Sequence, residues 1–594
     1  ERRDWILGRM LELGYITPQA HTTAVQSPVT ARHHGAQLSF AAHYAAEMAR
    51  QEMLDRYGMA AYNDGYHVYT TIDSELQQVA RRALIDGLKK YDSRHGYRGP
   101  ERQLAPATEG EDTTDQWLDI LAETAVIADL KPAIITAVGE DSVDLLLAGG
   151  QRDQLLWENG IRQASPYRTE NSRGSAPRSP AEVLAVGDLI RIERRGEDQR
   201  WHLTQVPAAQ AALVSLRPDN GAIISIVGGM GFELSKFNRA TQAQRQPGSN
   251  FKPFVYSAAL DAGFTAASII NDAPVVMEDT SLEDIWRPEN DGGKFHGPTR
   301  LRWALTKSRN LVSIRLLQQL GVPALIDYSR QIGFDTSEFA PDLSLALGTH
   351  AMSPLEVASA YAVLANGGYR VEPYLIERID NLAGDTVYEA RPYTVCRSCD
   401  QGGGEPDEDM ELSMEQILAR RERETSRMPQ APRVMDERVN FIIDSILRDV
   451  ITRGTGRRAL VLERGDIAGK TGTTNGPMDA WFSGYNPDVV TSTWVGFDNY
   501  TPLGRREFGG TAALPIWIDF MRQALKDLPE RKPPLPPGIV NVKIDPDSGL
   551  LAHSGQRNAI FEYFRVEYVP KDPAREEGPG SGSQGTDDLV KDIF

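Results

Sequence analysis

The chain has 594 residues, of which 41% are hydrophobic and 25% are charged. The length exceeds that of one ordinary domain, and the composition is that of a globular protein rather than of a disordered chain or a membrane protein. Asp and Glu outnumber Lys and Arg by 82 to 64, giving a net charge of −18. This balance argues against nucleic-acid binding as the main activity, because phosphate neutralisation requires a basic surface.

The start of the sequence carries no recognisable targeting signal. No uninterrupted run of about 18 apolar residues is present, so we expect no segment to span a bilayer. Signal-peptide features are also absent, and the first residue is Glu1 rather than Met. We therefore interpret the chain as a fragment whose export and anchoring signals lie upstream.

The first 206 residues predict helices followed by a small β unit. Residues 40–58 have apolar residues at helical spacing, and residues 67–73 are rich in β-branched and aromatic residues, as in a strand. Residues 74–91 predict a second helix, capped by Asp73 or Ser74. Short β-like runs separated by polar turns then predict a small inserted β-barrel or sandwich, at 132–139, 142–150, 188–195 and 201–206.

From residue 211 the pattern indicates a mixed sheet with helices packed on it. Residues 211–229 contain two alternating runs around Asp219-Asn220-Gly221, which is typical of a β-hairpin. Helical segments dominate from 254 to about 370, and a strand pattern returns at 490–497. The expected fold is therefore mixed α/β and multidomain.

Three later segments have unusual composition. Residues 400–434 are acidic and then basic, and we interpret them as a solvated loop or helix within an insertion. Residues 533–549 predict a stiff linker into a small β element, and 572–588 predict a disordered tail. The two cysteines, Cys396 and Cys399, supply only half a zinc site, so a local disulfide or two idle thiols is favoured over a metal.

Ser249 is the only serine followed by lysine three positions later, at Lys252. On a helix these residues are neighbours, so the Lys252 amine could take a proton from the Ser249 hydroxyl. This requires a lowered lysine pKa, which burial or a second cation would produce. Taken alone, the motif favours a structural interpretation, in which Ser249 caps a helix and Lys252 lies on a solvated face.

Two further motifs favour the catalytic interpretation. Ser308-Arg309-Asn310 is the only S-x-N sequence in the chain, and Lys470-Thr471-Gly472 is the only K-T-G sequence. The order S-x-x-K, S-x-N, K-T-G is a documented signature of penicillin-binding proteins and class A β-lactamases.

These residue types suit acyl transfer, which needs a nucleophile, a base, a proton path to the leaving amine and an oxyanion hole. Ser308 can relay a proton to the leaving nitrogen, and the Asn310 amide can hold a substrate amide. Lys470 offers positive charge to a substrate carboxylate, and Thr471 and Thr473 offer hydroxyls. Gly472 lies where backbone must approach a ligand closely.

The sequence resembles class A penicillin-binding proteins of the Gram-negative 1a type well beyond these motifs. Matching stretches are 236–254, 296–310, 343–368, 452–459 and 467–487. The resemblance implies a transpeptidase fold like that of serine β-lactamases, with a five-stranded antiparallel sheet flanked by helices and a small inserted OB-like β-barrel. It also implies that Ser249 is acylated, that Lys252 is its base, and that Ser308, Asn310 and Lys470 complete the site. The amides of Ser249 and Thr473 would form the oxyanion hole.

The resemblance also implies a division of the chain. Residues 1–36 correspond to the end of a glycosyltransferase domain whose catalytic glutamates lie upstream, so we expect this chain to lack glycan polymerisation, although the full-length protein would be bifunctional. The other expected parts are a linker region at 37–94, an OB-like insert at 95–206, a transpeptidase domain at 207–534 with an insertion at about 395–434, a β element at 535–570 and a disordered tail at 571–594.

The leading hypothesis is a D,D-transpeptidase that cross-links peptidoglycan stem peptides and is acylated by β-lactams, with no cofactor and no metal. The alternatives are a carboxypeptidase or β-lactamase using the same residues, and a non-catalytic β-lactam sensor. By resemblance, the protein works at the periplasmic face of the inner membrane, attached only through an upstream anchor. In some members of the family the OB-like insert meets an outer-membrane lipoprotein activator.

Overall fold

The structure is a computed structural model that describes residues 2–27, 40–105, 113–275, 277–278, 285–396 and 428–574. The chain divides into two compact units, residues 1–41 and 42–594. The first unit contains α1 (Arg2–Glu12) and α2 (Pro18–Gln26), and the Thr17 side chain caps α2. No helix in the described ranges is long and apolar enough to cross a membrane.

Two of the sequence predictions fall largely outside the described residues. The acidic-to-basic stretch 400–434 is described only from residue 428 onward. The tail expected at 571–594 is described only as far as residue 574. Cys399 also lies outside the described residues, whereas Cys396 is described and is disulfide-bonded.

The second unit is built on a five-stranded sheet in the order β11-β10-β20-β19-β18. All four pairings are antiparallel. The strands are β10 (Gln210–Leu216), β11 (Ile223–Val227), β18 (Ala468–Thr473), β19 (Asp479–Tyr485) and β20 (Val490–Gly496). The hairpin predicted at 211–229 is β10–β11, so that prediction is confirmed. The edge strand β18 carries the K-T-G motif.

Both faces of this sheet are covered by helices, as the alternation of its side chains requires. Leu213 and Phe482 belong to a core shared with α5 (Ser74–His95) and α14 (Leu514–Ala524). Val214 and Trp481 belong to the core on the other face, which includes α11 (Pro354–Asn366). The predicted helix at 74–91 is confirmed as α5, and the Asp73 carboxylate caps it by accepting from the N–H groups of Glu75 and Leu76.

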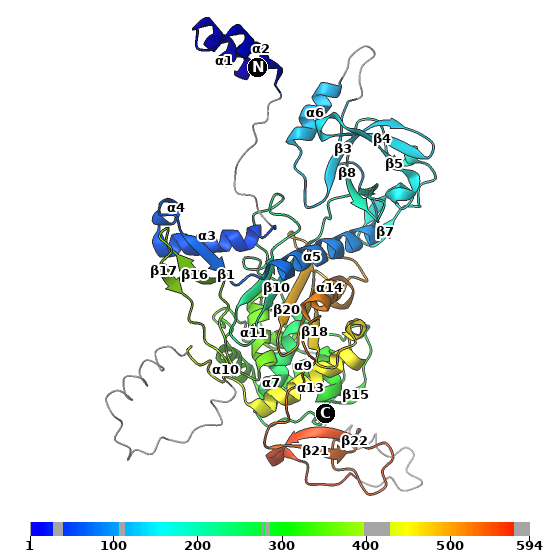
Figure 1. Cartoon of the computed structure of the whole chain (residues 1–594). Coiled ribbons are helices and arrows are strands. Elements are labelled where there is room, and N and C mark those ends of the chain that lie inside the picture. The colour runs from blue at the N-terminus through cyan, green and yellow to red at the C-terminus, as the bar shows by residue number, and fades with distance from the viewer. Residues whose placement is uncertain are drawn as a thin grey trace, which may run out of the picture. The chain divides into compact units, whose positions relative to one another are not determined.

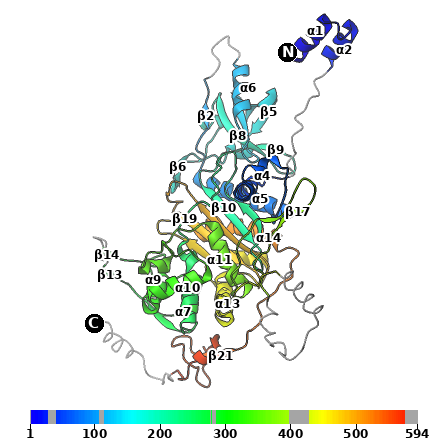
Figure 2. The same cartoon turned by 90° about the vertical axis from the view of Figure 1, so that its left-hand side faces the viewer.

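Further helices gather beside this second core, as Figures 1 and 2 show. Hydrophobic residues from α7, α8, α9, α10 and α13 join it. Their bounds are α7 (Lys252–Asp261), α8 (Leu301–Thr306), α9 (Asn310–Leu320), α10 (Val322–Ile332) and α13 (Glu437–Arg453). The first and third of these helices begin at residues of the S-x-x-K and S-x-N motifs, so packing in this core sets where both motifs lie.

Smaller elements surround this centre. The helix predicted at 40–58 is α3 (His43–Tyr57), and the strand predicted at 67–73 is β1 (His67–Thr70), so both predictions are confirmed. β1 pairs with β16 (Ile376–Asp380), which pairs with β17 (Thr386–Glu389). The predicted β unit is a six-stranded sheet with its own core, made of β2 (Arg102–Gln103), β3 (Lys131–Val138), β4 (Ser142–Leu147), β5 (Arg152–Leu156), β8 (Asp188–Arg195) and β9 (Arg200–Thr204).

A C-terminal hairpin is connected to α8 and α13 by a buried ion pair. The hairpin consists of β21 (Ile539–Ile544) and β22 (Ile560–Arg565), and it lies beside α13 (Figure 1). Glu562 on β22 is 1% exposed, and the Arg302 guanidinium of α8 donates to it over 2.6–2.9 Å. Arg302 also donates to Asp449 and Ser445 of α13, so this arginine joins three elements.

We expect Glu562→Ala to lower the free energy of unfolding by about 3 kcal/mol, because it leaves a buried guanidinium with fewer acceptors. Glu567→Ala is the matched control, because the pair between Glu567 and Arg438 is solvent-exposed and should contribute less than about 1 kcal/mol. Urea unfolding monitored by tryptophan fluorescence measures both variants. Equal effects would mean that the buried pair does not anchor the hairpin.

Candidate active site

Ser249 lies in a short 3₁₀ helix, Gly248–Phe251, that continues directly into α7. Its side chain is half-buried and makes no hydrogen bond to any described residue. The structure therefore differs from the predicted helix cap, because neither the 3₁₀ helix nor α7 has a side-chain cap at its start. The backbone turn itself presents the hydroxyl, which remains available to a ligand.

Two glycines allow the K-T-G strand to pass directly against this turn. A Cβ on Gly472 would lie 2.4 Å from the Pro247 carbonyl oxygen, and one on Gly248 would lie 2.7 Å from the Thr473 carbonyl oxygen. Both distances are shorter than real Cβ contacts. Gly248 also has a φ of +56°, which other residues rarely adopt. The absence of side chains at both positions thus brings Ser249 and β18 together.

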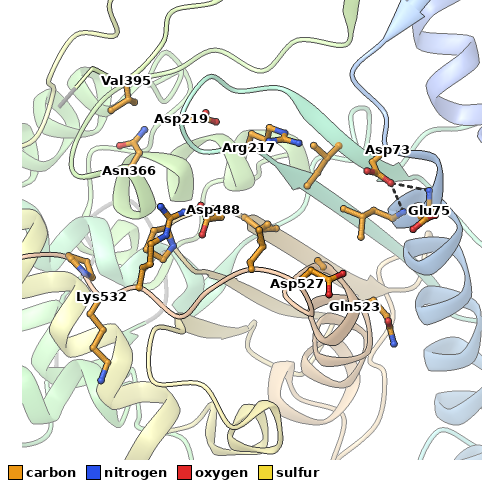
Figure 3. A pocket seen from close by; sticks show the side chains of 18 of the residues that line it. Asp73, Glu75, Arg217, Asp219, Asn366, Val395, Asp488, Gln523, Asp527 and Lys532 are labelled. Carbon is orange, nitrogen blue, oxygen red and sulfur yellow. Dashed lines mark hydrogen bonds and ion pairs between the residues drawn. The ribbon is translucent and has the colours of Figure 1, made fainter. Parts of the chain in front are cut away.

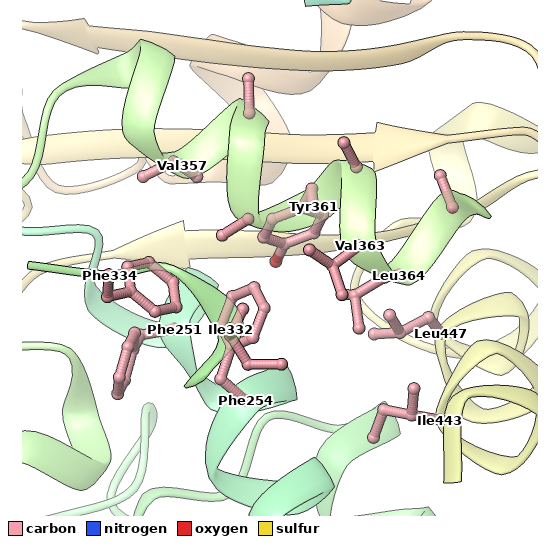
Figure 4. Packing of buried hydrophobic residues seen from close by; sticks show 14 of the residues in the cluster. Phe251, Phe254, Ile332, Phe334, Val357, Tyr361, Val363, Leu364, Ile443 and Leu447 are labelled. Atoms are coloured by element: carbon pink, nitrogen blue, oxygen red, sulfur yellow. The ribbon is translucent and has the colours of Figure 1, made fainter. Parts of the chain in front are cut away.

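The serine turn is fixed to the sheet and to the core by its neighbours. The buried Asn250 amide donates to Ser483 Oγ at 2.7 Å, and the Tyr361 hydroxyl donates to the Asn250 carbonyl oxygen at 2.7 Å. Phe251 and Phe254 pack edge-on against Phe334 in the cluster of Figure 4. No sequence pattern indicated the role of Asn250, because its partners lie far away along the chain.

Lys252 is fully buried, in contrast to the solvated face of the structural interpretation. Its Nζ donates to the Asn310 side-chain oxygen at 2.6 Å and to the Ser308 carbonyl oxygen at 2.9 Å. Ser308 lies between α8 and α9 with a φ of +59°, an uncommon conformation for a residue with a side chain. The first two motifs are therefore joined directly through the Lys252 amine.

Lys470 joins the third motif to the second. Its fully buried Nζ donates to Ser308 Oγ at 2.8 Å and to the Thr471 carbonyl oxygen at 2.9 Å. Ser308 thus contacts both lysines, one through its carbonyl and the other through its hydroxyl. All five predicted catalytic residues lie in or beside one hydrogen-bonded cluster, formed by segments that are distant in sequence.

The environment of this cluster lowers the pKa of both buried lysines. Burial first, and then the positive charges of Lys470 and Arg309, hold the pKa of Lys252 well below its ordinary value, whereas Asp272 acts in the opposite direction. Burial also lowers the pKa of Lys470 to about 7. A buried lysine that loses its proton near neutrality can accept one from a hydroxyl.

The predicted substrate-binding residues line the same strand. Thr471 Oγ1 lies 2.7 Å from Thr455 Oγ1, and Thr473 Oγ1 accepts from the Gly509 N–H at 3.1 Å. Both hydroxyls therefore have partners within the protein, which fix their rotamers beside the serine turn. Gly472 lies between them and supplies the close backbone contact described above.

A separate cavity of about 930 Å³ lies away from these residues. Figure 3 shows its charged lining, which includes Asp73, Arg217, Asp488 and Lys532, and none of the predicted site residues takes part. Within the described ranges, no group of three or more His, Cys, Asp or Glu side chains is placed to hold a metal ion. The side chains that surround Ser249 in the three motifs supply hydroxyl, amine and amide groups.

Comparison with known proteins identifies the family. The penicillin-binding protein transpeptidase domain matches residues 211–521, and the penicillin-binding protein OB-like domain matches 97–209. Penicillin-binding protein 1A of Pseudomonas aeruginosa is 49% identical over 99% of this chain and 72% of its own length. The chain belongs to the penicillin-binding protein 1A family. It is a serine-type D,D-transpeptidase of peptidoglycan synthesis.

Other relatives support the same assignment. Penicillin-binding protein 1A of Escherichia coli is 39% identical over 95% of this chain and 71% of its own length. The crystal structure of penicillin-binding protein 1A from Haemophilus influenzae has a TM-score of 0.84 at 37% identity, covering 97% of this chain and 83% of that one. The expected fold is thereby confirmed, with its five-stranded antiparallel sheet, its flanking helices and its OB-like insert.

Proposed function

We propose that Ser249 is the nucleophile that this penicillin-binding protein uses to cross-link peptidoglycan stem peptides. The observation that carries the proposal is the convergence of three motifs, in which Lys252 Nζ lies 2.6 Å from Asn310 Oδ1 and Lys470 Nζ lies 2.8 Å from Ser308 Oγ. Ser249 Oγ attacks the carbonyl carbon of the penultimate D-alanine while its proton passes to the neutral Lys252 amine.

The leaving group and the acceptor complete the transfer. As the peptide C–N bond breaks, Ser308 delivers a proton to the terminal D-alanine nitrogen, and Lys470 restores the Ser308 proton. An amine of a neighbouring stem peptide then attacks the acyl-enzyme, loses a proton to the site and releases the Ser249 hydroxyl. In a β-lactam the leaving nitrogen stays tethered after ring opening, so the acyl-enzyme persists.

The negative charge that develops on the carbonyl oxygen requires donors beside Ser249. We propose the backbone N–H groups of Ser249 and Thr473 for this role. The contact between the turn and β18 supports the proposal, because a Cβ on Gly248 would lie 3.3 Å from the Thr473 nitrogen. The Lys470 amine, with Thr471 and Thr473, is proposed to bind the terminal carboxylate of the substrate.

The remaining predictions are carried forward as proposals. We propose that residues 95–206 act as the OB-like insert, 207–534 as the transpeptidase domain and 535–570 as a C-terminal β element, with 1–36 as the end of a glycosyltransferase domain and 37–94 as the linker. We also propose that the insert binds an outer-membrane lipoprotein activator, and that the protein works at the periplasmic face of the inner membrane. The family membership supports each of these assignments.

Intact mass measurement after exposure to penicillin tests the proposed function. We expect one covalent adduct, mapped by proteolysis to the peptide that contains Ser249, which remains attached after free drug is removed. Rapid loss of the adduct with release of hydrolysed drug would favour a β-lactamase instead. A stable adduct without cross-linking of stem peptides, on the protein supplied with lipid-linked substrate and a polymerising partner, would favour a sensor.

A further inference from the structure

The start of α9, which carries the S-x-N motif, is capped by a side chain from a distant segment. The first N–H groups of a helix have no partner within it, and the residue just before the helix usually supplies one. In α9 that residue is Arg309, whose side chain makes no capping hydrogen bond. The Asn290 side-chain oxygen accepts instead from the N–H of Asn310 at 2.8 Å and of Leu311 at 3.4 Å.

Asn290 is itself held in one orientation by a buried carboxylate. It is 4% exposed, and its Nδ2 donates to Asp272 Oδ1 at 2.6 Å and to the Lys294 carbonyl oxygen at 2.9 Å. Because both amide hydrogens are used, the amide oxygen must point toward α9. Asp272, at the end of β12 (Ile269–Asp272), is fully buried, and its Oδ2 has no hydrogen-bond partner among the described residues.

A buried carboxylate with an unsatisfied oxygen destabilises the fold unless other interactions compensate. In this structure the compensating interaction is the hydrogen bond from Asn290, the residue that caps α9. The segment that carries Asn290 contacts Asn310 twice, because the Glu289 carbonyl oxygen also accepts from Asn310 Nδ2 at 2.7 Å. This second contact turns Asn310 Oδ1 toward the Lys252 amine, which lies 2.6 Å away.

We propose that Asn290 and Asp272 are positioning residues for acyl transfer, which orient Asn310 and, through it, the Lys252 amine. The inference rests on the roles proposed above for Lys252 and Asn310. The pair acts in two ways. Asn290 fixes the backbone of Asn310, and the Glu289 carbonyl in the same segment sets the direction of the Asn310 side chain. The Asp272 charge offsets part of the effect of the positive charges of Lys470 on β18 and Arg309 before α9, which lower the pKa of Lys252.

The geometric part of the proposal is tested by exchanging the two side chains. Asn290→Ala should slow acylation by fluorescent penicillin about 10- to 100-fold, because a small displacement of a catalytic group has this effect. The double variant D272N/N290D retains one amide and one carboxylate with their hydrogen bond reversed, and it places an acceptor at the helix start. We expect the exchange to recover most of the lost acylation rate relative to Asn290→Ala.

Asn440→Ala is the matched control. Asn440 is equally buried, and its amide donates to the Val363 and Leu364 carbonyl oxygens of α11, not to a residue of the three motifs. Its replacement should destabilise the fold by a similar amount and leave the acylation rate unchanged. If Asn290→Ala does not fold, the double variant and Asp272→Asn still decide the proposal.

The electrostatic part is tested by the pH dependence of acylation. Asp272 raises the pKa of Lys252, so Asp272→Asn should lower it further and keep the amine neutral in more acidic solution. The acid limb of the acylation profile should therefore move to lower pH. Loss of structure alone would reduce the rate at every pH without moving the limb.

The outcomes separate this inference from the proposed function. If the wild-type protein forms no adduct on Ser249, the proposed function and this inference are both wrong. If the wild type is acylated at Ser249 while Asn290→Ala reacts equally fast, only the positioning role is wrong. An unmoved acid limb in Asp272→Asn, or a double variant as slow as Asn290→Ala, would likewise overturn it.

Discussion

Replacing Ser249 with Ala is expected to abolish covalent labelling by fluorescent penicillin, with the acylation rate falling at least about 10⁴-fold. The hydroxyl is the only group at this position that can form the ester, and no described residue engages it in a hydrogen bond. The substitution removes one oxygen from a half-buried side chain, in a turn that is held by Asn250 and the phenylalanine cluster. The free energy of unfolding should therefore change by less than about 0.5 kcal/mol.

Ser257→Ala provides the matched control on α7, the helix that directly follows the Ser249 turn. Ser257 is fully buried on α7, and its hydroxyl donates to the Pro253 carbonyl oxygen at 2.8 Å. That variant should label at the wild-type rate, although it loses a buried hydrogen bond. Labelling of Ser249→Ala at the wild-type rate would show that another residue is acylated, and the assignment of the nucleophile would be wrong.

Most of the fold could be predicted from the sequence, because strands and helices show a characteristic periodicity of hydrophobic residues. The strands of the hairpin β10–β11 alternate between two cores, so the pattern of residues 211–229 indicated them correctly. The helix α5 was signalled by its spacing and by Asp73 at its cap. These features depend on local sequence and on the pattern of hydrophobic residues on the two faces of each element. Both can be recognised in the sequence of a single chain.

The site was predictable in its residue types but not in its contacts. The order of the three motifs identified Ser249, Ser308 and Lys470 as candidate site residues. For Lys252, however, the spacing on a helix predicted only that it is a neighbour of Ser249. In the structure Lys252 is held by Ser308 and Asn310. Asn290 and Asp272 were not predicted, because a capping contact between segments separated along the chain leaves no periodic or motif signal.

Replacing Lys252 with Met is expected to reduce acylation at least about 10³-fold while leaving the protein folded. Lys252 is fully buried, and burial is the main cause of its lowered pKa, so its amine is a source of instability that acyl transfer requires. Met has a similar unbranched shape and fills irregular core space. The substitution removes the buried amine but leaves the Ser308 carbonyl and the Asn310 oxygen without this donor.

These two effects oppose each other, so the free energy of unfolding should stay within about 1 kcal/mol of the wild-type value. Acylation kinetics with fluorescent penicillin and urea unfolding of the same preparation measure the two quantities. Lys526→Met, at an exposed lysine after α14, should change neither. An active Lys252→Met variant would mean that another group takes the Ser249 proton. An inactive variant that is also strongly destabilised would mean that Lys252 holds the site together through its hydrogen bonds, because a group kept only for proton transfer contributes little to folding.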